Sequence, residues 1–156
     1  MSSSVDVRAL MRRIPHGVAV LTVDVVGERL GLTLDSLVSL SLEPPLVGVS
    51  VSRQAAMHEL LRDAGVFGLS LLGGGQAALA QHFARGVPPI GLWHGIELRT
   101  GEGPPLLAAA IGWMRARVVA EHPAGDHTIF VGEVDWVESG DAGPPLVHVG
   151  GRYREL

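Results

Sequence analysis

The stretch 31–61, GLTLDSLVSLSLEPPLVGVSVSRQAAMHELL, contains the pattern that decides the fold. On both sides of Pro44-Pro45, apolar residues alternate with small or polar ones, as in LVGVSVS at 46–52. Alternation with a period of two predicts half-buried β-strands, here over 38–41 and 46–52. Proline lacks the N–H that the interior of a sheet needs, so the proline pair marks the connection between the two strands.

The same pattern, followed along the rest of the chain, predicts a mainly β protein. The predicted strands are 18–26, 30–34, 38–41, 46–52, 66–72, 110–121 and 127–138. The predicted helices are about 5–13, 54–64 and 75–85. Because strands dominate and helices do not alternate with them regularly, the pattern favours a β-barrel with peripheral helices over a doubly wound sheet. A chain of 156 residues fits one domain, so we expect a single domain over 1–156.

Composition excludes several classes of partner. The formal net charge is −4, and the twelve basic residues are all arginines scattered along the chain, which argues against nucleic acid. No apolar run is long enough to cross a membrane, and the absence of cysteine excludes disulfides and thiolate chemistry. We therefore expect a cytoplasmic protein. With 47% hydrophobic residues, it has apolar surface to cover, and we expect a homodimer.

Hydrogen-bonding side chains are unusually frequent in the 31–61 stretch. They are spaced at short intervals in otherwise apolar sequence and comprise Thr33, Asp35, Ser36, Ser39 and Ser41. A planar polar ligand lying along the strand edges would use such groups. The strand at 46–52 then runs through Ser52 and Arg53 into a helix start, where free N–H groups and the helix dipole favour a phosphate. The alternative is an ordinary helix cap by Ser52.

Two other motifs have plainer interpretations. Gly73, Gly75 and Ala78 satisfy the G-x-G-x-x-A dinucleotide pattern, but the helix after them is short and a proline pair follows, which favours a plain glycine turn. His122, Asp126 and His127 could share a metal ion, although no fourth ligand is nearby. We expect no metal site. Asp126 is expected to cap N–H groups of its own turn.

Taken together, the motifs resemble the flavin reductase family of FMN-binding split barrels. The segments RRIPHGVAVLT, GLTLDSLVSLSLEPPLVGVSVSRQAAMHELL, QAALAQHFA, GDHTIFVGEV and GGRYREL follow that family's order from about Leu10 to the end of the chain. The T-x-x-S segment before Pro-Pro-Leu and the Gly-Asp-His-Thr segment carry most of the specificity. The resemblance implies an FMN-binding split barrel, a six-stranded Greek-key antiparallel barrel with peripheral helices, in a homodimer that holds FMN or FAD near the subunit interface.

The resemblance also implies which residues hold the ligands. The isoalloxazine ring would be lined by Thr33, Leu34, Asp35, Ser36 and Leu37. The residues that lie along the ribityl chain and phosphate would be Ser50, Val51, Ser52, Arg53 and Gln54. The phosphate end would be closed by Phe83 and Ala84. His127 would lie beside the nicotinamide of NADH or NADPH, as a binding residue and not as an acid or base.

The chain departs from the family pattern at three positions. Many members have serine where this chain has Asp35, and serine and threonine where it has Ala55 and Met57. The last two differences remove hydroxyls near the phosphate. Asp35 places a negative charge near a ring that becomes anionic on reduction. We therefore expect weak flavin retention, which suits an enzyme that releases reduced flavin.

The implied function is an NAD(P)H:flavin oxidoreductase that supplies reduced FMN or FAD to a partner monooxygenase. Nicotinamide C4 must approach flavin N5 to roughly 3–3.5 Å. The chemistry belongs to the two nucleotides, so no catalytic side chain is expected. One alternative is a flavin- or haem-binding barrel without reductase turnover. Another is an oxidase of the pyridoxamine-phosphate type, which would need a more basic phosphate pocket than Arg53 alone provides.

Overall fold

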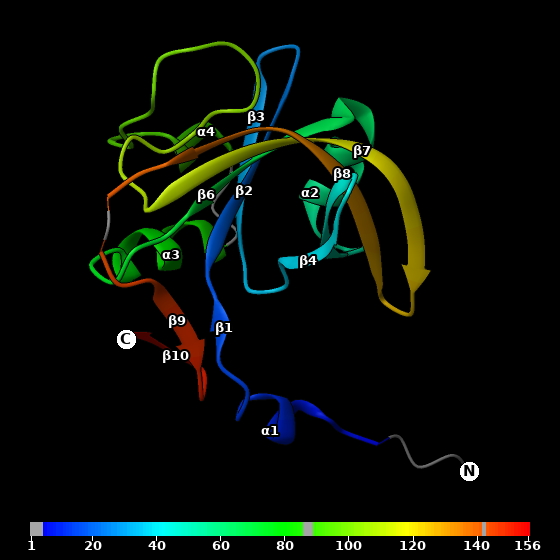
Figure 1. Ribbon diagram of the computed structural model, residues 1–156, viewed down its shortest axis with the longest axis vertical. Helices are drawn as coiled ribbons and strands as arrows, with labels where there is room; N and C mark the ends of the chain where they lie inside the picture. Colours follow the sequence, from blue (N-terminus) through cyan, green and yellow to red (C-terminus); the bar gives the residue numbers. More distant parts are fainter. Residues whose placement is uncertain (1–4, 86–88, 142) are drawn as a thin grey trace.

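The computed structural model describes residues 5–85, 89–141 and 143–156 and consists mainly of antiparallel strands (Figure 1). The main sheet has the spatial order β3-β2-β6-β7-β8-β5-β4. Its strands are β2 (Ala19–Val25), β3 (Glu28–Leu34), β4 (Val38–Leu42), β5 (Pro45–Ser52), β6 (Val66–Leu71), β7 (Gly112–Ala124) and β8 (His127–Ser139). A second sheet consists of β1 (His16–Gly17), β9 (Leu146–Val149) and β10 (Arg152–Glu155). The helices are α1 (Arg8–Met11), α2 (Ala56–Ala64), α3 (Ala77–Ala84) and α4 (Pro89–Leu92).

The seven strands predicted from alternation all occur, and their ends differ from the prediction by a few residues. The split-barrel class is confirmed, but the main sheet has seven strands where six were expected. The predicted helix 5–13 is a single turn, α1, and α2 begins two residues later than predicted. The short strands β1, β9 and β10 and the helix α4 were not predicted, because two to four residues are too few for a periodic pattern.

The two edge strands of the main sheet, β3 and β4, are consecutive in the chain. The sheet therefore curls, because a short link must connect its two edges. The link between them is only 35–37, and Ser36 fastens it to β5. The Ser36 hydroxyl donates to the carbonyl oxygen of Ser50 (3.1 Å) and accepts from the Ser50 N–H (3.0 Å). This side chain takes the place of a backbone pair just beyond the β4–β5 ladder, which begins at Val38 opposite Gly48. The Ser36 side chain therefore holds the link between the two edge strands against β5.

Helix α2 connects β5 to β6 and, in Figure 1, lies between β2 and the strands β5 and β8. It buries Met57, His58 and Leu61 on one face and packs against β2, β3, β5 and β6. The helix ends at Gly65, whose φ of 68° is the left-handed conformation that glycine adopts without strain. In the part of the chain that the structure describes, no helix is long and apolar enough to span a membrane.

The hairpin β9–β10, near the C-terminal end of the chain, lies beside β1 at one side of the barrel (Figure 1). Its turn is Gly150-Gly151, with φ values of 63° and 73°, as a tight two-residue hairpin requires. The N–H of Gly150 donates to the carbonyl oxygen of Arg12 (2.8 Å), and β1 pairs with β9 so that His16 lies opposite His148. The N-terminal segment is thereby held next to the C-terminal hairpin.

Candidate functional site

Two of the predicted binding segments meet where β5 ends and β8 begins. Ser52 lies opposite His127 in the antiparallel β5–β8 ladder. Beyond the ladder, the N–H of Arg53 donates to the carbonyl oxygen of Asp126 (2.9 Å). The segment proposed for the ribityl chain and phosphate therefore lies beside the histidine proposed for the nicotinamide, although the two are far apart in sequence.

The turn between β5 and α2 differs from the simple cap that Ser52 suggested. The helix begins at Ala56, and Ala55 is its N-cap without a side-chain bond. Ser52 lies before the cap, where its hydroxyl accepts from the Gln54 N–H (3.3 Å) and its carbonyl oxygen from the Ala55 N–H (3.1 Å). Among the described residues, none accepts a hydrogen bond from the N–H groups of Ala56 and Met57. These two donors at a helix start are the kind that bind a phosphate.

A polar cavity of about 320 Å³ lies at this helix start and includes Arg53. Its other arginine, Arg62, is held by Glu121 (2.8 Å) and Glu59 (3.5 Å). Arg53 is exposed and forms no ion pair with any acidic side chain in the described ranges. Arg62 thus pairs with both carboxylates of this cavity, and the guanidinium of Arg53 has no carboxylate partner among the described residues.

Four of the remaining predicted residues line a second cavity of about 160 Å³. They share it with Val18, His148 and Tyr153, and comprise Thr33, Leu34, Asp35 and Ala84. The Thr33 hydroxyl donates to the carbonyl oxygen of Ala80 (2.6 Å), so it anchors α3 as well as lining the cavity. This cavity brings together the end of β3, the end of α3 and the C-terminal hairpin.

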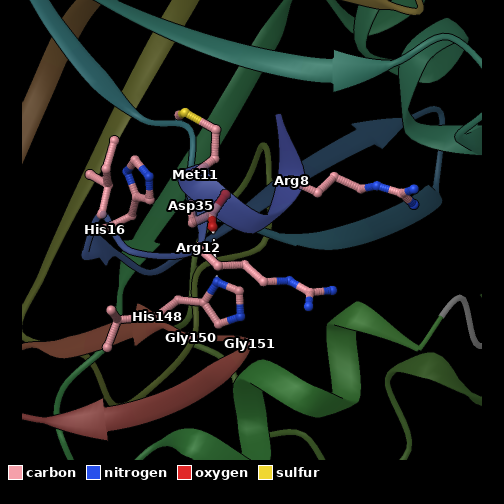
Figure 2. Close-up of a pocket in the computed structure, with 10 residues that line it drawn as sticks. Arg8, Met11, Arg12, His16, Asp35, His148, Gly150 and Gly151 are labelled. Atoms are coloured by element: carbon pink, nitrogen blue, oxygen red, sulfur yellow. Dashed lines mark hydrogen bonds and ion pairs between the residues drawn. The ribbon is translucent and has the colours of Figure 1, made fainter. Parts of the chain in front are cut away.

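Asp35 and His148 also line a larger adjoining cavity of about 310 Å³, shown in Figure 2. The His148 Nδ1 lies 3.0 Å from the Asp35 Oδ2, and both side chains are partly exposed. Burial, and secondarily the negative charge of Asp35, raises the pKa of the Tyr153 hydroxyl above its ordinary value. Sequence reasoning missed His148 and Tyr153. The Gly150-Gly151 pair is the signal that would have predicted their hairpin.

Three of the predicted residues have side chains that face the core or another cavity. Phe83 is 2% exposed and packs against Trp93, with ring centroids 5.3 Å apart. Val51 is buried in the barrel interior. Leu37 lines a separate apolar cavity of about 210 Å³. Val51 therefore presents only its backbone to the site, because consecutive residues of a strand face opposite sides of the sheet. The Phe83 side chain lies in the core beneath α3.

Asp126 and His127 form a pair at the entrance to β8. The His127 Nδ1 lies 2.7 Å from the Asp126 Oδ1, so the main partner of the carboxylate is the imidazole. Of the expected bonds to N–H groups of the turn, only one to the N–H of Asp126 itself contributes, and it has the smallest effect on the pKa of the carboxyl. The hydrogen bond with His127, together with the nearby imidazole charge, lowers the pKa of the Asp126 carboxyl. The pairing occupies Nδ1 and leaves Nε2 of His127 as the nitrogen that can face a ligand.

The glycine turn at 73–76 uses its N–H groups internally. The N–H of Gly73 donates to the Gln76 side chain (2.7 Å), and that of Gly74 to the carbonyl oxygen of Pro144 (2.7 Å). Donors engaged in this way do not cradle a pyrophosphate, which agrees with the plain-turn interpretation. Within the described residues, no group of three or more His, Asp or Glu side chains is placed to hold a metal ion.

Comparison with known proteins identifies the class of this barrel. The NADH:FAD oxidoreductase of Streptomyces globisporus superposes with a TM-score of 0.91 and 34% identity, covering 100% of this chain and 98% of the other. The reductase component of 4-hydroxyphenylacetate 3-monooxygenase from Thermus thermophilus is 42% identical over 146 residues, 94% of this chain and 92% of its own. An NADH:FMN oxidoreductase of Rhodococcus erythropolis is 39% identical over 158 residues, 96% of this chain and 80% of its own.

Fold, motif order and relatives define a split-barrel protein of the flavin reductase type. The model of the flavin reductase like domain matches residues 11–156. The chain belongs to the flavin reductase family.

Proposed function

We propose that the protein transfers hydride from NADH to FMN and releases the reduced flavin to a separate monooxygenase. It is an NAD(P)H-dependent flavin reductase, as its family and relatives indicate. The choice of NADH follows the relatives named above. FMN is favoured because, of the two arginines that line this cavity, Arg53 is the one without a described carboxylate partner, which suits one terminal phosphate. Because NADH is a cytoplasmic reductant, we place the enzyme in the cytoplasm.

The observation that carries the proposal is the meeting of three distant segments at one edge of the barrel. Ser36 is bonded to Ser50, Ser52 lies opposite His127, and Arg53 is bonded to Asp126. Each contact joins segments that the family resemblance assigns to the flavin ring, the phosphate and the nicotinamide. A site that must hold two nucleotides in contact requires these segments to be adjacent.

The residues present fit a flavin mononucleotide. We assign its phosphate to Arg53 and the N–H groups of Ala56 and Met57, which are free to donate. We assign the ring to the strand edge that runs from Thr33 to Ser36, beside the cavity closed by Ala84. Ser50, Ser52 and Gln54 would follow the ribityl chain. When bound, the flavin supplies the two-electron chemistry, and the protein orients it.

Steady-state NADH oxidation tests the proposal. The purified protein should oxidise NADH only when FMN or FAD is added, with more than one turnover per protein molecule. An absorption spectrum of the protein as purified would show how much flavin it retains. A protein that binds flavin or haem but supports a single turnover would instead be a carrier or sensor. Transfer to a monooxygenase would appear as product formation when the two proteins are combined.

His127→Ala should raise the KM for NADH several-fold and leave the affinity for FMN nearly unchanged. The Nε2 of His127 is free to donate a hydrogen bond to the nicotinamide carboxamide or a phosphate, while hydride transfer needs no proton from it. Steady-state kinetics at varied NADH would measure this effect. A collapse of kcat at saturating NADH with an unchanged KM would contradict the binding role. Asp126→Asn, which keeps a hydrogen-bond acceptor, is the matched variant and should have the smaller effect.

The exposed face of β4 supports a homodimer. Val38, Leu40 and Leu42 are 50, 49 and 86% exposed on an edge strand, an apolar patch of the kind that an interface covers. Light scattering at micromolar concentration should give twice the chain mass of 16.4 kDa. Leu42→Asp should shift the protein towards the monomer. A wild-type monomer that reduces flavin at the full rate would contradict the dimer.

A further inference from the structure

The pair Asp35–His148 is not explained by flavin binding alone. Asp35 directly follows β3, in the segment assigned to the flavin ring. Its carboxylate lies 3.0 Å from His148 and borders both cavities on that side of the barrel. A charged group bordering a ligand site affects binding most strongly when the charge of the ligand changes during the reaction.

The ligand charge does change here. Transfer of hydride from nicotinamide C4 to flavin N5 breaks one C–H bond and forms one N–H bond, and both electrons move with the hydrogen. NADH becomes NAD⁺, and the neutral oxidised ring becomes a reduced ring with one negative charge. A carboxylate near the ring leaves the neutral substrate almost unaffected, but it repels the anionic product.

We propose that Asp35, held in place by His148, weakens the binding of reduced flavin relative to oxidised flavin and so makes the site favour product release. This inference rests on the proposed function. Asp35 is a specificity-determining residue in this role, and His148 is a positioning residue that fixes the carboxylate.

Other titratable or charged groups border the pair from three elements. They are Tyr153 on β10, His16 on β1, and Arg8 and Arg12 on α1. In Figure 2 the Arg8 and Arg12 side chains extend away from Asp35 and His148. Arg8 is bound by Asp6 (2.8 Å). The raised pKa of the Tyr153 hydroxyl keeps that group neutral, and the charge of Asp35 contributes to this effect. Asp35 therefore provides the negative charge nearest the end of β3.

The test is the ratio of two dissociation constants, for reduced and for oxidised FMN, measured anaerobically on the full chain. Asp35→Asn keeps the size of the side chain and an oxygen that accepts from His148, but it removes the charge. We expect the ratio of the reduced to the oxidised constant to fall about tenfold, the size of effect of one partly screened charge at close range. The midpoint potential of bound FMN should rise in parallel. Asp135→Asn is the matched control, since Asp135 is similarly exposed and ion-paired but lies in β8 against Arg115.

The His148→Gln variant shows whether charge or packing determines the ratio of the two dissociation constants. Glutamine can still donate to Asp35 but cannot be protonated, so the ratio should stay as high as in the wild type or rise. A fall in both variants would show that packing, and not charge, sets the ratio, and would overturn the inference. An unchanged ratio in Asp35→Asn, with normal binding of oxidised FMN, would also overturn it and leave the proposed function intact. A wild-type protein that binds neither form would overturn the proposed function and the inference together.

Discussion

Replacement of Arg53 by alanine is expected to weaken the binding of FMN by about ten- to a hundredfold and to leave riboflavin binding nearly unchanged. Charge-assisted hydrogen bonds to a phosphate contribute about 1.5–3 kcal/mol, which corresponds to this range. Riboflavin has no phosphate, so it does not use the arginine. The dissociation constants can be measured by quenching of flavin fluorescence or by calorimetry.

The matched control is Arg115→Ala, because Arg115 is also an arginine of the surface but is paired with Asp135 on a strand away from this cavity. Its removal should change neither constant. Equal losses for FMN and riboflavin in Arg53→Ala would contradict the assignment of the phosphate to the β5–α2 turn. In that case the cavity lined by Arg53 would have another role.

Gly132→Ala is expected to destabilise the protein by about 1–3 kcal/mol, the range found for an extra methyl group in a well-packed core. A Cβ atom at Gly132 would lie 2.6 Å from the ring of Phe67 and 3.0 Å from the Cβ of Ala116. Phe67 is fully buried in the barrel, so its ring has no space into which to move. Denaturant unfolding followed by circular dichroism would measure the loss, and the melting temperature should fall by roughly 2–4 °C per kcal/mol.

Gly17→Ala is the control, because it makes the same change in strand β1. A Cβ atom at Gly17 would have no other atom within 4 Å. The loss of backbone freedom in the unfolded chain should make this variant neutral or slightly more stable. Equal losses at both positions would show that strand propensity, and not the contact with Phe67, determines the effect at Gly132.

The strands of the barrel were predictable because each depends on local pattern. The alternation in 46–52 predicted β5, and the proline pair before it fixed where the strand begins. The long strands β7 and β8 were predicted for the same reason. The order of the motifs then identified the split-barrel class. A period of two needs no knowledge of the partner strand, since it follows from the geometry of the strand itself.

The site was predictable in part. Strand-to-helix sequence around Arg53 indicated a phosphate position, and the described turn leaves two N–H groups free there. The sequence did not indicate that Phe83 faces the core, because a short helix with apolar residues on several sides does not specify which side is buried. It also suggested a helix cap at Ser52, whereas the cap lies at Ala55, since cap positions depend on the exact end of the preceding strand.

By itself, the sequence determined the class of fold and the family, and it predicted the segments of the candidate site. Only the tertiary structure determined which side chains meet within that site. Asp35 and His148 are more than a hundred residues apart and come together because the C-terminal hairpin pairs with β1 beside the end of β3. Ser52 and His127 meet because β5 pairs with β8, which lies far along the chain. Pairings of this kind depend on the closure of the barrel, which is a property of all its strands together and leaves no periodic signal in any one of them.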